Sequence, residues 1–226
     1  MPSLLTSKTA NMPVAIKICG INSAAAMTAA VTGGAAHVGL MFYPPSPRFL
    51  CLTQAAELAA MVPDGITRVG VFVDAGADTI ARTLEAVPLD VLQLHGHETA
   101  DEITVLRDRF GLPVIRTIKL AGPADLATAV ELEAVADLIL FDALPPPDMT
   151  GALPGGNALS FDWALLKGYQ GTRPWLLSGG LKADNLAKAI AMTGARIVDV
   201  SSGVETAPGA KNPAMIGAFL AAARGL

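Results

Sequence analysis

The chain has 226 residues, of which 52% are hydrophobic and 16% are charged, and its net charge is −4. This length suits one α/β domain with a full core. The small negative charge, without a lysine or arginine cluster, argues against nucleic acid or an anionic membrane as a partner. No run of about 20 predominantly apolar residues predicts a membrane helix. Residues 1–13 lack the basic start and apolar centre of a signal peptide, so we expect a cytoplasmic protein.

Eight short apolar runs, rich in β-branched residues, predict strands in chain order. They cover residues 14–19, 36–42, 68–73, 89–94, 113–118, 137–141, 175–178 and 197–200. Between them lie Ala-rich segments with helical spacing, as in residues 53–61, 125–135 and 182–192. Eight strands alternating with eight helical segments predict an α/β fold, a single (β/α)₈ TIM barrel over residues 14–226 after an N-terminal tail of residues 1–13.

An open doubly wound sheet is the structural alternative to the barrel. Its dinucleotide-binding form carries G-x-G-x-x-G after the first strand, whereas here the first strand runs into Cys-Gly-Ile-Asn, residues 19–22. The chain has two cysteines, too few for a disulfide scaffold, and no Cys/His cluster has zinc spacing. We therefore expect no metal site.

In a barrel of this kind the catalytic groups lie at the C-terminal ends of the strands. The first strand ends in Cys19 and the sixth is followed by Asp142, so the two side chains could flank a substrate as general base and general acid. We expect nearby cations or anion-binding loops to lower the thiol pKa from about 8.5. The alternatives are a small buried hydrophobic residue at Cys19 and a capping residue at Asp142.

Two Gly/Ser loops follow the seventh and eighth strands, where barrels commonly bind phosphate. Glycines let backbone N–H groups approach an oxyanion closely. These loops predict a phosphorylated small-molecule substrate, although tight turns would also use such glycines. The candidate residues are Gly179, Gly180, Ser201, Ser202 and Gly203.

Two basic residues accompany these strand ends. Arg48 follows three prolines, and its planar fork of donors suits a substrate carboxylate, although a solvated surface charge is equally consistent with composition. Lys17 lies two residues before Cys19, so strand alternation places it on the same side, deeper in the barrel. There it either lowers the thiol pKa or pairs with another buried charge.

In this order, the strand ends resemble phosphoribosylanthranilate isomerase of tryptophan biosynthesis. The most specific matches are "KICG" (17–20), "FYPPSPR" (42–48) and "DVSSGVE" (199–205) followed by "PGAKN" (208–212). Weaker matches are "VGVFVD" (69–74), "LQLHGHE" (92–98), "ILFDA" (139–143), "FDW" (161–163) and "LSGGL" (177–181).

The resemblance implies an Amadori rearrangement without metal or organic cofactor. It implies Asp142 as the acid that protonates the furanose ring oxygen and Cys19 as the base that removes the C2 proton. It assigns Arg48 to the anthranilate carboxylate. The other substrate-binding positions that it implies are Gly155, Gly156, Gly179, Gly180, Ser201, Ser202, Gly203, Asp199, His95 and Gln93. Asn157 and Ala158 stand where the family often has Thr-Gly, so this loop is expected to close differently.

Alternative functions remain open at this stage. The related isomerase of histidine biosynthesis uses two aspartates and shows a two-fold repeat, and Cys19 and the lack of a clear repeat count against it. A non-catalytic sugar-phosphate-binding barrel would need neither Cys19 nor Asp142. A thiol-nucleophile hydrolase would need a base beside Cys19. We expect a monomer, because no exposed apolar stripe is evident.

Overall fold

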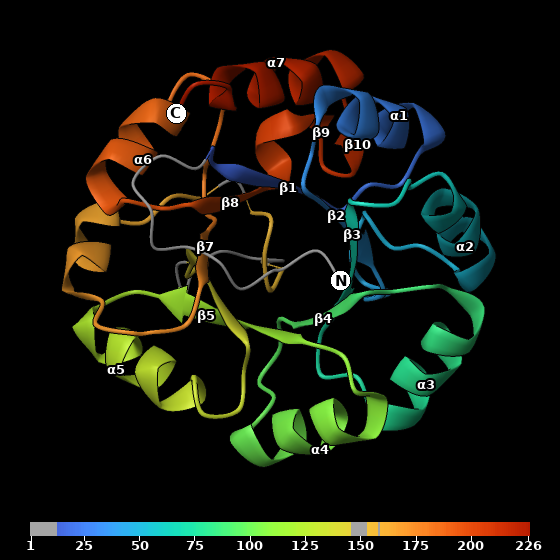
Figure 1. The fold of residues 1–226 in the computed structure, drawn as a ribbon, viewed down its shortest axis with the longest axis horizontal. Coiled ribbons are helices and arrows are strands. Elements are labelled where there is room, and N and C mark those ends of the chain that lie inside the picture. Colours follow the sequence, from blue (N-terminus) through green and yellow to red (C-terminus); the bar gives the residue numbers. More distant parts are fainter. Residues whose placement is uncertain (1–12, 146–152, 158) are drawn as a thin grey trace.

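In the computed structural model, which describes residues 13–145, 153–157 and 159–226, eight parallel strands close into a barrel (Figure 1). Each strand pairs with the next one in sequence, and the last pairs with the first. This confirms the predicted TIM barrel. The strands are β1 (Ala15–Cys19), β2 (His37–Met41), β3 (Thr67–Phe72), β4 (Val91–Leu94), β5 (Val114–Leu120), β6 (Leu138–Ala143), β7 (Trp175–Leu177) and β8 (Ile197–Val200).

Helices surround the barrel as an outer ring (Figure 1). A short 3₁₀ helix, η1 (Trp163–Gly168), stands between β6 and β7, where we expected a helical segment like the others. The α-helices are α1 (Ala24–Gly33), α2 (Leu52–Ala60), α3 (Ala77–Ala86), α4 (Ala100–Phe110), α5 (Pro123–Leu132), α6 (Leu186–Thr193) and α7 (Pro213–Ala223). After β8 come a 3₁₀ turn, η2 (Ser202–Val204), and a hairpin of β9 (Glu205–Ala207) and β10 (Ala210–Lys211).

Local sequence signals explain where helices begin and end. In α4, Thr99 and Glu102 form a reciprocal capping box, and Gly111 ends the helix at φ 63°. Helix α6 begins four residues later than the expected start at residue 182. The Asn185 side chain binds the N–H of Lys182 at 2.8 Å and the carbonyl of Gly180 at 2.9 Å. These bonds hold a turn that the helical pattern did not reveal.

Buried side chains form two layers. The inner layer fills the barrel and includes Cys19, which therefore points into it; its members are Cys19, Val69, Val71, Val91, Ile115, Leu138, Leu140 and Leu176. The outer layer joins strands to helices and contains most of the remaining core, including Ile18, Phe72, Phe141 and Phe219. Because successive strand residues alternate between these layers, side chains two residues apart face the same side of the sheet.

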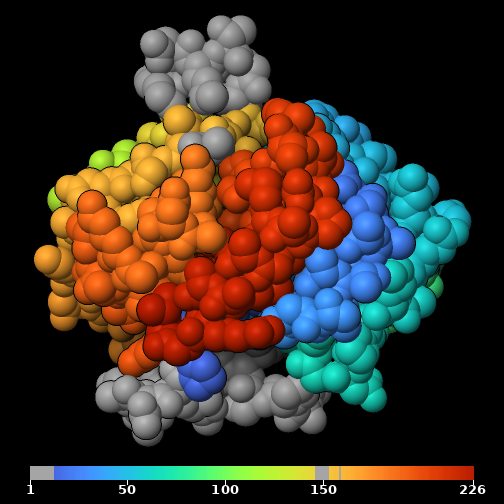
Figure 2. All heavy atoms as spheres, turned by 90° about the horizontal axis from the view of Figure 1, so that it is seen from above, coloured from blue at the N-terminus to red at the C-terminus, as the bar shows by residue number. Residues whose placement is uncertain are grey.

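The first and last parts of the barrel meet along one seam. Strand β8 is hydrogen-bonded to β1, and α7 packs on α1, as Figure 2 shows from outside. The approach is close at Gly33, where an added Cβ would lie 2.3 Å from Cδ1 of Leu220. In the part of the chain that the structure describes, no helix has the length and apolar character needed to cross a membrane. The expected tail, residues 1–13, falls outside the described residues except for residue 13, so it stays a prediction.

Candidate active site

A pocket opens at the C-terminal ends of the barrel strands. The structure brings the predicted site residues together here, with the exception of Gln93. The predicted residues that line it are Cys19, Arg48, His95, Asp142, Gly155, Gly156, Gly179, Gly180, Asp199, Ser201, Ser202 and Gly203. The candidate acid and the candidate base thus face one cavity from β6 and β1.

Cys19 lies beside a buried ion pair. Nζ of Lys17, fully buried, is 2.9 Å from Oδ1 of Asp199, on the neighbouring strand β8. Gly39 on β2 leaves room for both side chains, since an added Cβ would lie 3.1 Å from Sγ of Cys19 and 3.3 Å from Nζ of Lys17. Lys17 takes both of the roles expected for it, because it pairs with a buried charge and also acts to lower the pKa of the Cys19 thiol.

The pKa of Cys19 is raised above its ordinary value, where we expected it to be lowered. Burial is the main cause, because a thiolate loses its hydration inside the barrel, and the charge of Asp199 raises the pKa further. Lys17 and Lys211 lower the pKa without outweighing these effects. The raised pKa favours the thiol form of Cys19, and Lys17 and Lys211 are the neighbouring cations that favour its ionisation.

Asp142 is held on the opposite wall of the pocket. Its Oδ1 accepts a hydrogen bond of 2.9 Å from the backbone N–H of Ala143, and its Oδ2 lies 3.4 Å from Nε2 of His95. Gly155 covers this pair so closely that an added Cβ would lie 2.6 Å from Nε2 of His95 and 2.9 Å from Oδ2 of Asp142. One carboxylate oxygen is thus fixed by the backbone, and the other faces His95 and the cavity.

The two Gly/Ser loops after β7 and β8 pack tightly against each other. An added Cβ at Gly203 would lie 1.8 Å from the carbonyl oxygen of Leu181. Gly179 and Gly180 adopt φ values of 87° and 67°, which favour glycine. Among the described residues, the backbone N–H groups of these two glycines donate to no other group. These loops thus offer free donors to an anion, as expected of a phosphate site.

Arg48 belongs to a charged cluster with Glu205 and Lys211, two residues that the sequence analysis did not single out. Its Nε and Nη2 each lie 2.8 Å from a carboxylate oxygen of Glu205, and Nη2 also donates to the carbonyl of Gly156 at 3.1 Å. Lys211 Nζ joins Glu205 at 2.7 Å. Two cations share one carboxylate, so the cluster keeps a positive charge, and Nη1 of Arg48 is left for a ligand. Both Glu205 and Lys211 lie within the matched motifs of residues 199–212, and this match could have marked them as candidate site residues.

The β6–β7 loop contributes a short turn, residues 153–157, to the pocket. Asn157 closes this turn by accepting from the N–H of Leu153 at 3.0 Å and donating to its carbonyl at 2.7 Å. The turn places Gly155 over Asp142 and Gly156, at φ 74°, against Arg48. Asn157, which differs from the usual family residue, thus holds the turn closed with two side-chain hydrogen bonds. Ala158 and most of the proline-rich segment before Leu153 lie outside the described residues.

Gln93 does not line the pocket. It is fully buried beneath His95, two residues earlier on the same side of β4, and its Nε2 lies 3.1 Å from Nδ1 of His95. Any effect of Gln93 on a ligand must therefore pass through His95.

Comparison with known proteins assigns this arrangement to a family. Residues 16–222 match the family model of N-(5'phosphoribosyl)anthranilate (PRA) isomerase. The chain belongs to this isomerase family. A relative from Rhodospirillum centenum, N-(5'-phosphoribosyl)anthranilate isomerase, is 54% identical over 95% of this chain and 100% of its own length. The enzyme of the same name from Cereibacter sphaeroides is 52% identical over 93% of this chain and 99% of its own.

Solved structures of the family share the fold. The phosphoribosyl anthranilate isomerase from Thermotoga maritima superposes with a TM-score of 0.84 at 34% identity, covering 94% of this chain and 100% of that one. Another, with a TM-score of 0.81 at 33% identity and the same coverage, is a complex with reduced 1-(o-carboxyphenylamino)-1-deoxyribulose 5-phosphate. That relative thus binds a small phosphorylated molecule.

Proposed function

We propose that this chain catalyses the Amadori rearrangement of N-(5-phosphoribosyl)anthranilate to 1-(2-carboxyphenylamino)-1-deoxyribulose 5-phosphate, a step of tryptophan biosynthesis. The observation that carries the proposal is the placement of Cys19 and Asp142 in one pocket whose rim is formed by the Gly/Ser loops. Family membership supplies the substrate. The reaction only relocates protons and electrons within the sugar, so acid and base groups suffice for it.

Asp142 begins the reaction as the acid. It gives its proton to the furanose ring oxygen, the bond between that oxygen and C1 breaks, and the nitrogen lone pair forms a Schiff base. Cys19, as thiolate, then takes the proton from C2, which leaves an enolamine that tautomerises to the ketone. Cys19 on β1 and Asp142 on β6 are three strands apart around the barrel, which allows the two groups to act on different faces of the bound sugar.

The ends of the substrate are held by separate groups. The Gly/Ser loops with Gly179, Gly180 and Ser201–Gly203 offer N–H and hydroxyl donors for the phosphate. Arg48, through Nη1, offers donors for the anthranilate carboxylate. Holding both ends fixes C1 and C2 between acid and base, and such positioning lowers the barrier of a proton transfer substantially.

The quaternary state and location belong to this proposal. A solved relative from Thermotoga maritima is dimeric. For this chain we propose a monomer, because its exposed large hydrophobic side chains are spread around the barrel: Phe49, Leu52, Met61, Val105, Val130 and Leu144. We also propose that it acts in the cytoplasm. Sedimentation equilibrium tests the first point, and a mass of twice 23.2 kDa would contradict it.

The deciding experiment follows the fluorescence of freshly generated phosphoribosylanthranilate. We expect rapid loss of signal with the wild-type protein and none with Cys19→Ala, because the variant lacks the base. Cys51→Ala is the matched control, since Cys51 is the other thiol and is exposed; it should act like the wild type. No turnover by the wild type would refute the proposal and point to another aminosugar phosphate or to a binding protein.

A further inference from the structure

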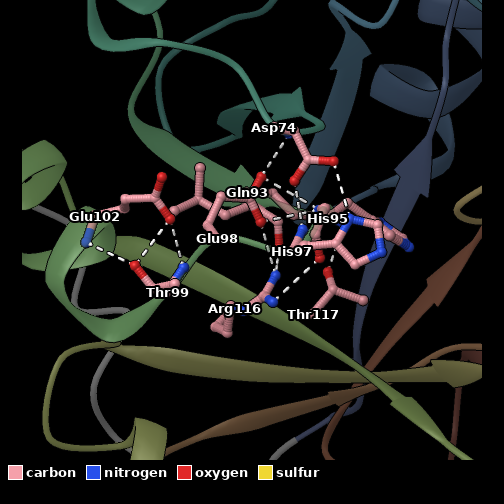
Figure 3. A network of polar contacts seen from close by, with 11 residues as sticks. Asp74, Gln93, His95, His97, Glu98, Thr99, Glu102, Arg116 and Thr117 are labelled. Atoms are coloured by element: carbon pink, nitrogen blue, oxygen red, sulfur yellow. Dashed lines mark hydrogen bonds and ion pairs between the residues drawn. The ribbon is translucent and has the colours of Figure 1, made fainter.

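Three polar side chains, one on β4, one directly after β4 and one on β5, are buried close to one another. Figure 3 shows Gln93, His95 and Thr117 pointing toward one another. Gln93 Nε2 lies 3.1 Å from Nδ1 of His95 and 3.5 Å from Oγ1 of Thr117. His95 and Thr117 are 8% and 4% exposed, and Gln93 is fully buried. Such a buried set is maintained only where its members find partners, so the orientation of each matters for the next.

The direction of the first hydrogen bond determines the tautomer of His95. The amide N–H of Gln93 donates to Nδ1, so Nδ1 must present its lone pair and the proton of a neutral ring resides on Nε2. Nε2 is buried and lacks a hydrogen-bond partner among the described residues, and 3.4 Å away lies Oδ2 of Asp142. The donor thus lies near the carboxylate oxygen that the backbone leaves free, without a hydrogen bond to it. Catalytic hydrogen bonds are often long before a ligand binds.

The segment that carries His95 is fastened from the other side of the sheet. Arg116, on β5, donates to the carbonyls of Leu94 and Gly96 and pairs with Glu98 at 2.9 Å (Figure 3). Glu98 in turn accepts from the backbone N–H of Gly96 at 2.9 Å. Both charged residues are buried. These contacts fix the backbone on both sides of His95, so its ring is held in place before a substrate enters.

We propose that His95 is a positioning residue for the general acid and that Gln93 sets its tautomer. The inference rests on the proposed function, in which Asp142 donates the proton. The Nε2–H of His95 turns Oδ2 of Asp142 toward the sugar and stabilises the carboxylate left after proton donation. The transferred proton moves from Asp142 to the ring oxygen, and His95 keeps its own proton throughout. Gly155 is required above the pair because any Cβ there would intrude between them.

The charged and titratable groups around this pair are few. Of those that line the pocket, Cys19 and Asp199 come from β1 and β8, and Tyr43 and Arg48 follow β2. Arg48 and Asp199 are already in ion pairs with Glu205 and Lys17, respectively. His95 is the residue that the structure places in ion-pair distance of Oδ2 of Asp142, at 3.4 Å.

Nitrogen NMR tests the tautomer without relying on activity. The chain has three histidines, so ¹⁵N-histidine labelling gives a simple spectrum that single substitutions can assign. At pH 8 we expect the His95 proton on Nε2 in the wild-type protein. In Gln93→Glu, the ionised carboxylate can only accept a hydrogen bond from the ring. This substitution should therefore move the proton to Nδ1. A wild-type proton on Nδ1 would overturn the inference, and this position is read from the wild-type protein.

Kinetics test the effect on Asp142. His95→Leu should lower kcat by about 100-fold, the order expected for a misplaced catalytic group, with KM changed less than about threefold. His95→Gln, whose amide N–H can take the place of Nε2–H, should recover about tenfold of that loss. Equal activity of the two variants, or a loss confined to KM, would contradict positioning. If the wild type fails to turn over phosphoribosylanthranilate, the proposed function fails, while the NMR result still decides the Gln93–His95 link.

Discussion

Cys19 and Asp142 lie on two different walls of the pocket, and each wall surrounds its residue with a different kind of interaction. Around Cys19, on the β8–β1–β2 side, buried ion pairs dominate: Lys17 with Asp199, and Arg48 with Glu205. Around Asp142, on the β4–β6 side, the contacts are a backbone N–H and an imidazole fixed by an amide. The ion pairs place fixed charges beside the Cys19 thiol, whereas the contacts of Asp142 add no fixed charge next to its carboxyl group. In the proposed mechanism, the base thus receives electrostatic support and the acid receives directional support.

Removing a charge from the first wall should have the largest effect. Lys17→Met leaves Asp199 buried without its partner, and breaking such a pair destabilises a protein by about 3–5 kcal/mol. Urea unfolding measures this loss. The double variant Lys17→Met/Asp199→Asn should recover most of the stability.

Arg68→Met is the matched control, because the Arg68–Asp90 pair is partly exposed and should contribute less than about 1 kcal/mol. Similar losses in Lys17→Met and Arg68→Met would show that burial of the Lys17–Asp199 pair carries no special weight. The contrast between the two walls would then fail.

Arg48 tests whether the first wall also binds substrate. Arg48→Ala should raise KM by about 100-fold, because a hydrogen-bonded contact between charged groups contributes about 3 kcal/mol, and change kcat little. Initial rates with phosphoribosylanthranilate give both constants. Arg82→Ala, at an exposed position on α3, should match the wild type. An unchanged KM in Arg48→Ala would leave Arg48 as a structural partner of Glu205 alone.

A smaller effect should appear in the pH dependence of stability. Burial, and then the charge of Lys17, lower the pKa of His37 from 6.5 to about 4. Between these values the unfolded chain binds the proton more readily than the folded chain. The contribution of His37 to the free energy of unfolding is therefore fully present above pH 6.5 and is lost as the pH drops toward 4. From pH 8 to pH 5 we expect a loss of about 2 kcal/mol through this group.

Urea unfolding at several pH values measures that loss. His37→Gln should remove it, whereas His97→Gln, at an exposed ring, should retain it. Because Lys17 contributes to the low pKa, Lys17→Met should make the dependence shallower. A profile that is the same in wild type and His37→Gln would mean that the first wall imposes no such charge effect.

The sequence predicted the barrel and the positions of most site residues because both depend on local patterns. Apolar runs mark the strands, and residues that follow strand ends meet at one face of a parallel barrel. The pairing of Arg48 with Glu205 joins residues 157 positions apart, and that of Lys17 with Asp199 joins residues 182 apart. No local pattern specifies such pairs. Likewise, the raised pKa of Cys19 depends on how deeply the thiol is buried, and the order of residues in the sequence does not give this depth.

Gln93 illustrates the same limit on a smaller scale. Its spacing from His95 predicts that both point into the barrel, and they do. Which of them reaches the cavity depends on depth along the strand, and only the fold resolves that depth. The turn at residues 153–157 is similar, because Asn157 replaces the expected family residue and compensates with side-chain bonds to Leu153.

The seam between β1 and β8 has a consequence for synthesis of the protein on the ribosome. Strand β1 emerges first, but its partner β8 emerges about 180 residues later, as the spacing of Lys17 and Asp199 shows. Until then β1 has an unpaired edge, and Lys17 and Cys19 face an unfinished interior. Contacts of such long range are slow to form, and unpaired strand edges promote aggregation. The emerging chain is therefore expected to be most prone to aggregation before the last strand is made.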